Sequence, residues 1–138
     1  MSQILLGYLQ YWMKKNKILI FGSDGTLSKE IIKLIDKNST IIKINRKVLD
    51  FNKKKMNIEI NKILSKQNPD IIINSSGVLG SNFDLYENVF STNFGSNWEI
   101  IKYYLKRKKS KKVKIIMIGS SAYKSGKKNY LLYSSSKS

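Results

Sequence analysis

The chain has 138 residues, no cysteine, no histidine and a formal net charge of +17. Disulfides, cysteine nucleophiles and the common zinc sites are therefore excluded, and acid–base chemistry must come from Tyr, Lys, Asp, Glu or a cofactor. The length predicts one domain, and 41% hydrophobic residues are enough for a buried core. No stretch is long and apolar enough to span a bilayer, so we expect no membrane contact and a cytoplasmic location.

The positive charge comes almost entirely from lysine, which argues against a nucleic-acid surface. Arg46 and Arg107 are the only arginines, and arginine is the residue favoured for paired contacts with bases and phosphates. The densest basic run, Lys106–Lys112, lies between a predicted helix and a predicted strand, and we interpret it as a solvated connection. Nucleic-acid binding through this run is the least favoured alternative.

Strand and helix patterns alternate along the chain, which predicts a parallel sheet covered by helices. The strands are expected at residues 17–21, 41–44, 71–73 and 113–118, with a short additional strand at 47–49. The helices are expected at residues 27–35, 56–65, 87–105 and from 129 onward. In the long helix the apolar spacing predicts a core-facing side, made of Phe90, Phe94, Trp98, Ile101 and Leu105. The domain is expected to cover residues 13–138, with residues 1–12 as an N-terminal extension.

A glycine-containing turn follows the first strand and opens the first helix. Glycines there allow a tight turn and let the backbone approach a pyrophosphate, whose charge is stabilised at the helix N-terminus. Ser28 stands where a third glycine or alanine is usual, and its small size still permits close packing. Many strand–helix turns carry glycine by chance, but the position after the first strand favours a dinucleotide site. The residues predicted to bind the cofactor here are Gly22, Ser23, Asp24, Gly25, Thr26 and Leu27.

Polar residues also follow the second strand. An acidic residue at this point selects NAD, whereas an arginine favours the 2′-phosphate of NADP. The chain has Asn45-Arg46 there, so NADP(H) is favoured over NAD(H), although an exposed turn that carries arginine explains the pair nearly as well. Asp50 and Phe51 are predicted to flank the adenine; alternatively, Asp50 caps the next helix.

Small polar residues follow the buried isoleucine strand at 71–73. Such residues at the carboxyl end of a central strand line the crevice where a dinucleotide lies, although an ordinary loop would look similar. The residues concerned are Asn74, Ser75, Ser76 and Gly77.

The catalytic candidates lie near the end of the sequence. Tyr133 and Lys137 are four residues apart, so they share one face of a helix. A nearby ammonium favours the phenolate form of a tyrosine, which suits it to exchange a proton with a substrate. A serine hydroxyl such as that of Ser120 can hold a substrate oxygen as charge develops. The Tyr–Lys pair taken alone is explained as well by coincidence.

The order of these motifs resembles the short-chain dehydrogenase/reductase superfamily over residues 17–138. The resemblance implies a doubly wound Rossmann-type fold with helices on both faces, an NAD(P) cofactor, and interconversion of a carbonyl and an alcohol by hydride transfer. It makes Tyr133 the general acid/base, has Ser120 steady the carbonyl, and has Lys137 hold the nicotinamide ribose. Asn93 stands where the family's helix asparagine holds a water in the proton relay. Tyr133 and Lys137 therefore also count as cofactor-binding residues.

Two departures from the family pattern keep alternatives open. The spacing of Gly22 and Gly25 is similar to that of the extended, sugar-nucleotide-modifying branch, and residues 41–71 resemble dTDP-4-dehydrorhamnose reductases. Residues 118–122 and the Tyr133–Lys137 pair instead resemble the commoner oxidoreductases. Family members are also about twice as long, so the chain looks like a C-terminally truncated form without most of the substrate pocket.

Three functions therefore remain: a carbonyl/alcohol oxidoreductase, a sugar-nucleotide epimerase, dehydratase or reductase, and a non-catalytic fragment or nucleotide-binding protein. The resemblance further implies a homo-oligomer in the full-length form, assembled through the helix at 87–105 and the Tyr133 helix.

Overall fold

The computed structural model describes residues 15–80, 85–107, 111–126 and 128–137. The strands within these ranges are β1 (Lys17–Phe21), β2 (Thr40–Ile44), β3 (Ile71–Asn74) and β4 (Lys114–Met117). The helices are α2 (Thr26–Leu34), α3 (Met56–Gln67), α4 (Tyr86–Phe90), the π-helix η1 (Ser91–Gly95), α5 (Ser96–Leu105), α6 (Ala122–Ser125) and α7 (Leu131–Ser136). The predicted extension at residues 1–12 and residues 108–110 of the basic run lie outside the described residues.

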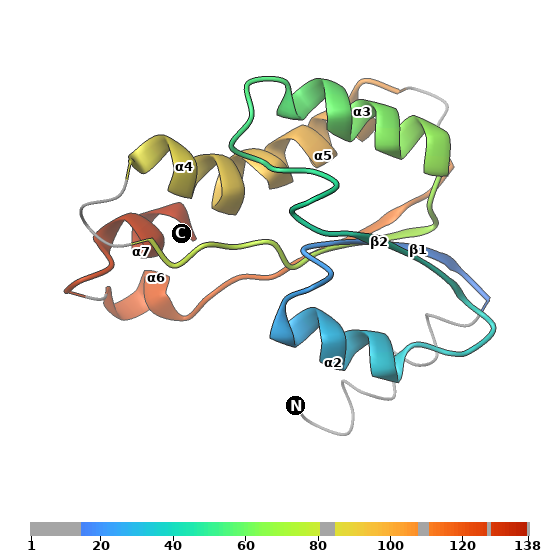
Figure 1. The fold of residues 1–138 in the computed structure, drawn as a ribbon, viewed down its shortest axis with the longest axis horizontal. Helices are drawn as coiled ribbons and strands as arrows, with labels where there is room; N and C mark the ends of the chain where they lie inside the picture. Colours follow the sequence, from blue (N-terminus) through green and yellow to red (C-terminus); the bar gives the residue numbers. More distant parts are fainter. Residues whose placement is uncertain (1–14, 81–84, 108–110, 127, 138) are drawn as a thin grey trace.

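The described strands form one parallel sheet in the order β2-β1-β3-β4. β1 lies inside the sheet, with Ile18 opposite Ile41 on β2 and Ile71 on β3. Helix α2 covers one face, and α3 and α5 cover the other (Figure 1). The predicted α/β fold with a doubly wound parallel sheet is therefore confirmed.

The two faces of the sheet carry cores of different size. Leu19 and Phe21 of β1 point toward α3 and α5, where they pack with Ile60, Leu64 and Ile100. The alternate residues of β1, Ile18 and Ile20, belong to a smaller isoleucine-rich cluster that packs toward α2. Because both faces are covered, β1 and β3 are apolar runs, and each fully buried side chain contributes roughly 1.5–3 kcal/mol of transfer free energy.

The short strand predicted at residues 47–49 does not form. The side-chain oxygen of Asn45 accepts hydrogen bonds from the backbone N–H groups of Lys47 (3.1 Å) and Val48 (3.2 Å). The backbone oxygen of Asn45 also accepts from Val48 and Leu49. Asparagine thereby closes a turn directly after β2, which competes with continued extended structure.

The predicted long helix is present as α4, η1 and α5, but the predicted core-facing side is wrong. Phe94, Trp98 and Leu105 are 56%, 47% and 72% exposed. The buried stripe instead runs through Val89, Asn93, Ser96, Ile100 and Tyr103. Two apolar stripes run along this helix, and the one that contains Asn93 and Ser96 faces inward because these polar groups find hydrogen-bond partners inside the protein.

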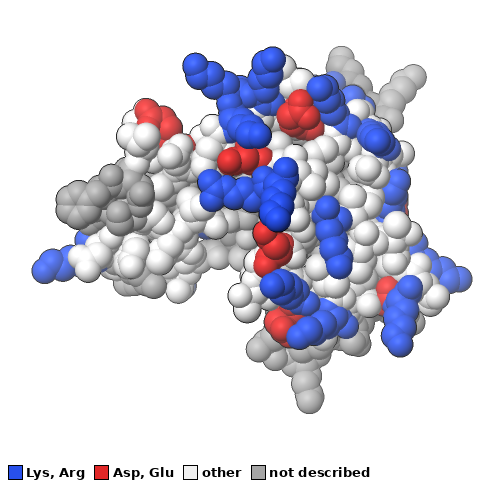
Figure 2. Space-filling view, viewed as in Figure 1, with Lys and Arg blue, Asp and Glu red and all other residues white. Residues whose placement is uncertain are grey.

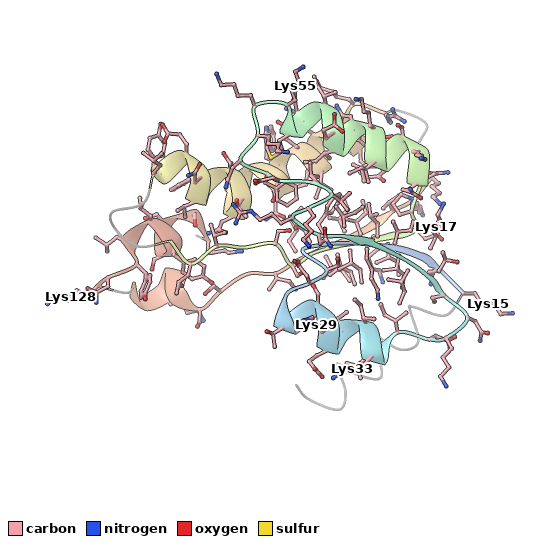
Figure 3. All side chains as sticks on the ribbon, viewed as in Figure 1. Lys15, Lys17, Lys29, Lys33, Lys55 and Lys128 are labelled. Carbon is pink, nitrogen blue, oxygen red and sulfur yellow. The ribbon has the colours of Figure 1, made fainter. Side chains whose placement is uncertain are left out.

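Lysine and arginine side chains are spread over the visible surface, with acidic residues among them (Figure 2). Lys29 and Lys33 lie on α2, Lys55 lies beside α3, and Lys128 lies at the opposite end of the molecule near α7 (Figure 3). Within the described ranges, no helix is long and apolar enough to cross a membrane.

Candidate functional site

A cleft of about 220 Å³ opens where the strands β1, β2 and β3 end. It is lined by the glycine turn after β1, the turn after β2 and the segment after β3, which the parallel sheet brings to one edge. Of the predicted cofactor-binding residues, the cleft is lined by Gly22, Asp24, Gly25, Asn45, Arg46, Asp50, Phe51, Ser75, Ser76 and Gly77. The sequence did not single out four further lining residues, namely Ile44, Leu49, Val78 and Thr92.

Gly22 lies close against Ser76, and both residues line the cleft. Its φ angle is +72°, and a Cβ there would lie 2.8 Å from the backbone nitrogen of Ser76 and 2.9 Å from its Cα. Any other residue would be strained and would collide with backbone. The turn is fixed by hydrogen bonds from the Gly22 N–H to the Ile44 oxygen (2.9 Å) and from the Gly25 N–H to the Gly22 oxygen (3.1 Å).

Two serines attach the glycine turn to β3. Ser28 is fully buried at the position of the usual third glycine, and its hydroxyl donates to the Gly22 oxygen at 2.9 Å. The Ser28 hydroxyl also contacts the Ser75 hydroxyl, which donates to the Phe21 oxygen at 2.9 Å. A small side chain at position 28 therefore permits close packing and ties the start of α2 to the end of β3.

The amino end of α2 faces the same region without a side-chain cap. Gly25 precedes the helix, no capping hydrogen bond forms, and the first turn contains no acidic residue. The first amide groups of a helix have no acceptor inside it, so this end favours an anion. Thr26 and Leu27 belong to this first turn, and Ser23 is buried with its N–H bonded to the Ile44 oxygen. None of these three residues lines the cleft.

The turn after β2 places a carboxylate beside the predicted phosphate-binding arginine. Arg46 Nε lies 3.6 Å from Asp50 Oδ2, and both residues line the cleft. No acidic residue is adjacent to Arg46 in the sequence, but the folded site does contain a carboxylate, that of Asp50. Asp50 does not cap α3, because it accepts the Asn52 N–H (3.0 Å) and the helix begins only at Met56. Phe51 is buried against Phe21, with ring centroids 5.8 Å apart.

Two polar residues at the end of β3 have different surroundings: Asn74 bonds to the long helix, and Ser76 lines the cleft. Asn74 is buried and points to the long helix, where its amide donates to Ser96 Oγ (2.9 Å) and Asn97 Oδ1 (2.6 Å). Its side-chain oxygen accepts the Ser76 N–H at 3.2 Å. The hydroxyl of Ser76 is buried and has no hydrogen-bond partner among the described residues. A buried hydroxyl without a partner is costly, so this wall of the cleft has an unmet hydrogen-bonding capacity.

Asn93 and Lys137 do not line the cleft, but both lie beside Gly77, which does. The Asn93 amide forms a pair of hydrogen bonds with the backbone of Val78, at 2.8 and 2.9 Å, and also donates to Ser136 Oγ on α7 at 2.8 Å. The Lys137 ammonium donates to the Ile118 oxygen at 3.3 Å, and burial lowers the pKa of this lysine below its ordinary value. A Cβ on Gly77 would lie 3.5 Å from both Asn93 Oδ1 and Lys137 Nζ.

Tyr133 and Ser120 lie on the two segments that follow β4. Tyr133 is half-buried on α7, and its backbone oxygen accepts the N–H of Lys137 at 3.1 Å, so the pair has the predicted helical relation. The Ser120 hydroxyl accepts the Ala122 N–H at 3.2 Å. In the described parts of the chain, no hydrogen bond joins Ser120 to Tyr133. The structure thus brings Asn93, Gly77 and Lys137 together. Ser120 lies just before α6 and Tyr133 lies on α7; these two helices contact each other.

No protein-family model and no curated protein matches the chain, whereas many solved structures do. A dTDP-4-dehydrorhamnose reductase from Clostridium acetobutylicum is 21% identical with a TM-score of 0.71, over 88% of this chain and 46% of that protein. A putative short chain dehydrogenase from Escherichia coli is 17% identical with a TM-score of 0.72, over 91% of this chain and 70% of that protein. An NADH-dependent reductase solved with NAD is 19% identical with a TM-score of 0.64, over 91% of this chain and 68% of that protein.

The chain therefore has the Rossmann-type fold that short-chain dehydrogenases and dTDP-4-dehydrorhamnose reductases share. It spans about half the length of the dTDP-4-dehydrorhamnose reductase from Clostridium acetobutylicum.

Proposed function

We propose that the chain is the cofactor-binding part of an NAD(P)-dependent oxidoreductase of the short-chain type, which interconverts a carbonyl and an alcohol. The observation that carries the proposal is the position of Lys137. This lysine, which ends the helix that carries the candidate acid–base tyrosine, lies beside Gly77, and Gly77 lines the cleft formed by the strand ends.

The cleft fits a nicotinamide dinucleotide in three respects. The Gly22 turn admits no side chain against Ser76, so backbone rather than side chain would face a pyrophosphate. The uncapped amino end of α2 offers amide groups to its negative charge. The unpartnered Ser76 hydroxyl lacks a hydrogen bond that a polar ligand would supply.

The roles that we propose for the chain's own residues rest on the family resemblance, supported for Asn93 and Lys137 by their contacts. A bound nicotinamide dinucleotide would supply the hydride chemistry, and the phenol oxygen of Tyr133 would donate or accept the accompanying proton. Lys137 holds a positive charge next to this tyrosine, and the Ser120 hydroxyl binds the substrate oxygen. Asn93 is a positioning residue, because its amide fixes the backbone of Val78 and reaches Ser136 on the tyrosine helix.

The direct test is cofactor binding by the chain, measured by calorimetry with NADPH and NADH. We expect saturable binding that Gly22→Val abolishes, because the added side chain collides with the Ser76 backbone. Tyr133→Phe should leave binding unchanged and reduce carbonyl turnover by a factor of about 100 or more. Unchanged turnover in Tyr133→Phe, or binding that survives Gly22→Val, would refute the assignment.

We further propose a preference for NADP(H), supported by the position of Arg46 in the wall of the cleft. Arg46→Ala should weaken NADPH binding about tenfold and leave NADH binding nearly unchanged. Asp50 complicates this proposal, since its carboxylate lies 3.6 Å from Arg46 Nε. Asp50→Asn should therefore strengthen NADPH binding, and an equal loss of both cofactors in Arg46→Ala would exclude the preference.

Two alternatives have an observation in their favour. A non-catalytic nucleotide-binding role is favoured because, among the described residues, Ser120 bonds to the Ala122 N–H and makes no hydrogen bond to Tyr133; it predicts cofactor binding without turnover. A sugar-nucleotide substrate is favoured by the likeness to that reductase and by the spacing of Gly22 and Gly25. Turnover of dTDP-linked sugars in preference to simple carbonyls would identify the second alternative.

The exposed stripe on α4–α5 supports the proposed homo-oligomer. Phe94, Trp98 and Leu105 are all about half exposed or more, and α7 packs beside α4 with Leu131 58% exposed. Apolar side chains gathered on one helix face favour burial against a second copy. Trp98→Lys should convert the oligomer to a monomer, measured by light scattering; a wild-type monomer would contradict the proposal.

A further inference from the structure

A second and larger cavity, of about 530 Å³, lies away from the cleft, between the carboxyl ends of α3 and α5. These helix ends lead into β3 and β4, so the cavity is at the amino end of the sheet, opposite the strand ends that form the cleft. Its volume is in the range of small-molecule sites. The lining residues are Leu64, Ser65, Asn68, Tyr103, Tyr104, Arg107 and Lys111, none of which is acidic.

Aromatic and guanidinium groups form one wall of this cavity. The rings of Tyr103 and Tyr104 meet edge to face, with centroids 4.9 Å apart at 81°. The guanidinium carbon of Arg107 lies 4.0 Å from the centroid of the Tyr103 ring. This cation–π contact restrains the guanidinium while its N–H groups remain able to donate. The wall therefore combines a flat surface with a fixed positive charge.

Among the described residues, the guanidinium of Arg107 pairs with no carboxylate, whereas the ammonium of Lys111 pairs with Asp70. The Lys111 ammonium donates to the Asn68 oxygen (2.7 Å) and to Asp70 Oδ1 (2.8 Å). Across the described residues, no carboxylate pairs with Arg107, and neither the Tyr104 hydroxyl nor the Asn68 side-chain amide makes a hydrogen bond. Burial raises the pKa of Tyr104 to about 12, so its hydroxyl is a donor at neutral pH. Three unmatched polar groups thus line one cavity.

We propose that this cavity binds a ligand that combines a planar aromatic ring with a phosphate, the chemistry of a free mononucleotide. The rings of Tyr104 and the stacked Arg107 offer surfaces on which an aromatic ring stacks. Arg107 and the Tyr104 hydroxyl donate to the phosphate, and the Asn68 amide can pair with polar edges of the ring. The site shares no residue with the cleft, so it does not depend on the proposed cofactor.

Amide chemical shifts of the isotopically labelled chain, titrated with uridine 5′-monophosphate, locate the ligand directly. We expect saturable shifts at Leu64, Ser65, Asn68 and Tyr103–Arg107, with the amides of Gly22, Gly25 and Gly77 reporting separately on the cleft. Uridine and inorganic phosphate should each bind about tenfold more weakly than the nucleotide, because each offers only part of the chemistry. Absence of saturable shifts around the cavity would overturn the proposal.

A matched pair of variants separates a built site from attraction to a basic surface. Arg107→Ala and Lys106→Ala each remove one positive charge from adjacent exposed positions, but only Arg107 lines the cavity. Arg107→Ala should weaken binding about tenfold and Lys106→Ala by less than about twofold, while the spectrum of each free variant confirms its fold. Equal losses in the two variants would overturn the proposal.

Two further comparisons refine the ligand. Tyr104→Phe keeps the ring and removes the hydroxyl, so binding should weaken by about threefold to tenfold; an unchanged affinity would contradict the phosphate contact. A thymidine decanucleotide should bind no more tightly than the mononucleotide. Clearly tighter binding of this strand through the same amides would overturn a free mononucleotide as the ligand.

Discussion

The two ends of the strands in this sheet use polar groups in opposite ways. Where the strands begin, Asp70 joins three of them: its carboxylate accepts the Lys17 N–H (2.7 Å) and the Lys111 ammonium (2.8 Å), and its backbone oxygen accepts the Lys114 N–H (3.0 Å). Where the strands end, the Ser76 hydroxyl has no partner among the described residues, and the Lys137 ammonium is half-buried beside Gly77 with a hydrogen bond to the Ile118 oxygen. The strand starts therefore contribute stability, whereas the strand ends keep one unpartnered hydroxyl and a partly desolvated ammonium that a ligand can use.

This contrast predicts that substitutions at the two ends differ in kind. A change at the strand starts should reduce the free energy of unfolding and leave the cleft's ligand binding intact. A change at the glycine turn should reduce both, because the turn supports the fold and approaches the ligand.

Gly22→Ala should have the largest effect on stability. The φ angle of +72° and the 2.8 Å approach to the Ser76 nitrogen both oppose a Cβ, so we expect a loss of about 3 kcal/mol in the free energy of unfolding. Denaturant titration followed by circular dichroism measures this loss, and calorimetry with NADPH measures the accompanying loss of binding.

Two other glycines separate the causes of that loss. Gly126 has a φ angle of +60° but no described atom within 4 Å of an added Cβ, so Gly126→Ala should cost only about 1 kcal/mol. Gly119 has neither restriction, and Gly119→Ala should change stability by less than about 0.5 kcal/mol. Equal losses at positions 22 and 126 would show that the contact with Ser76 is unimportant.

Asp70→Asn should have a smaller effect that is confined to the strand starts. The variant loses the charged contact with Lys111, which is 39% exposed, so we expect a loss of about 1 kcal/mol at neutral pH and unchanged cofactor binding. The hydrogen bond from Lys111, followed by that from the Lys17 N–H, lowers the pKa of Asp70 below 3.8. Its stabilisation is therefore present above pH 3.8 and is lost as the pH falls through the folded-state pKa.

The acid limb of the unfolding free energy tests the Asp70 interpretation. Wild-type stability should fall through this pH range more steeply than that of Asp70→Asn. Glu30→Gln is the matched control, because Glu30 pairs with Lys33 at an exposed position on α2 and should contribute almost nothing. An acid limb that is the same in wild type and Asp70→Asn would show that Asp70 does not join the strands.

The fold was largely predictable from the sequence because the strands are continuous apolar runs. Residues 17–21 and 71–73 are short, continuous apolar runs, which are typical of strands in a sheet that is covered on both faces. The position of the glycine turn after β1 was predictable for the same reason. The side of the long helix that faces the core was not predictable from the sequence. Phe94 and Trp98 form an apolar stripe as regular as the buried one, and only the hydrogen-bond partners of Asn93 and Ser96 decide between the two stripes.

The site was predictable where it depends on strand ends and unpredictable where it depends on contacts between distant segments. Gly22, Ser76 and Gly77 follow strands and line the cleft as expected. Thr92 also lines it, but nothing in its local sequence indicates this. Arg107 belongs to a run that was interpreted as a solvated connection, because its stacking on Tyr103 depends on how α5 ends.

Lys137→Met should not lower the free energy of unfolding at neutral pH, and the sign of this effect distinguishes the two ends of the strands. Burial lowers the pKa of Lys137 below 10.5, so the folded protein releases this proton before the unfolded chain does. Between the two pKa values the unfolded state binds more protons, and stability therefore rises with pH. Below the folded-state pKa both states are protonated, and the half-buried charge costs stability in full, in contrast to the stabilising charge of Asp70.

The unfolding free energy from about pH 7 to about pH 10 measures this cost. Wild type should gain stability over the range, whereas Lys137→Met should be less dependent on pH and no less stable than wild type at neutral pH. Lys29→Met removes an exposed lysine from α2 and should retain the wild-type slope (Figure 3). Above about pH 10 the raised pKa of Tyr104, about 12, makes stability fall again, so the range stops there. If Lys137→Met keeps the wild-type dependence of the unfolding free energy on pH, the Lys137 ammonium does not destabilise the folded protein. The contrast with Asp70 would then be wrong for the residue on which the proposed chemistry depends.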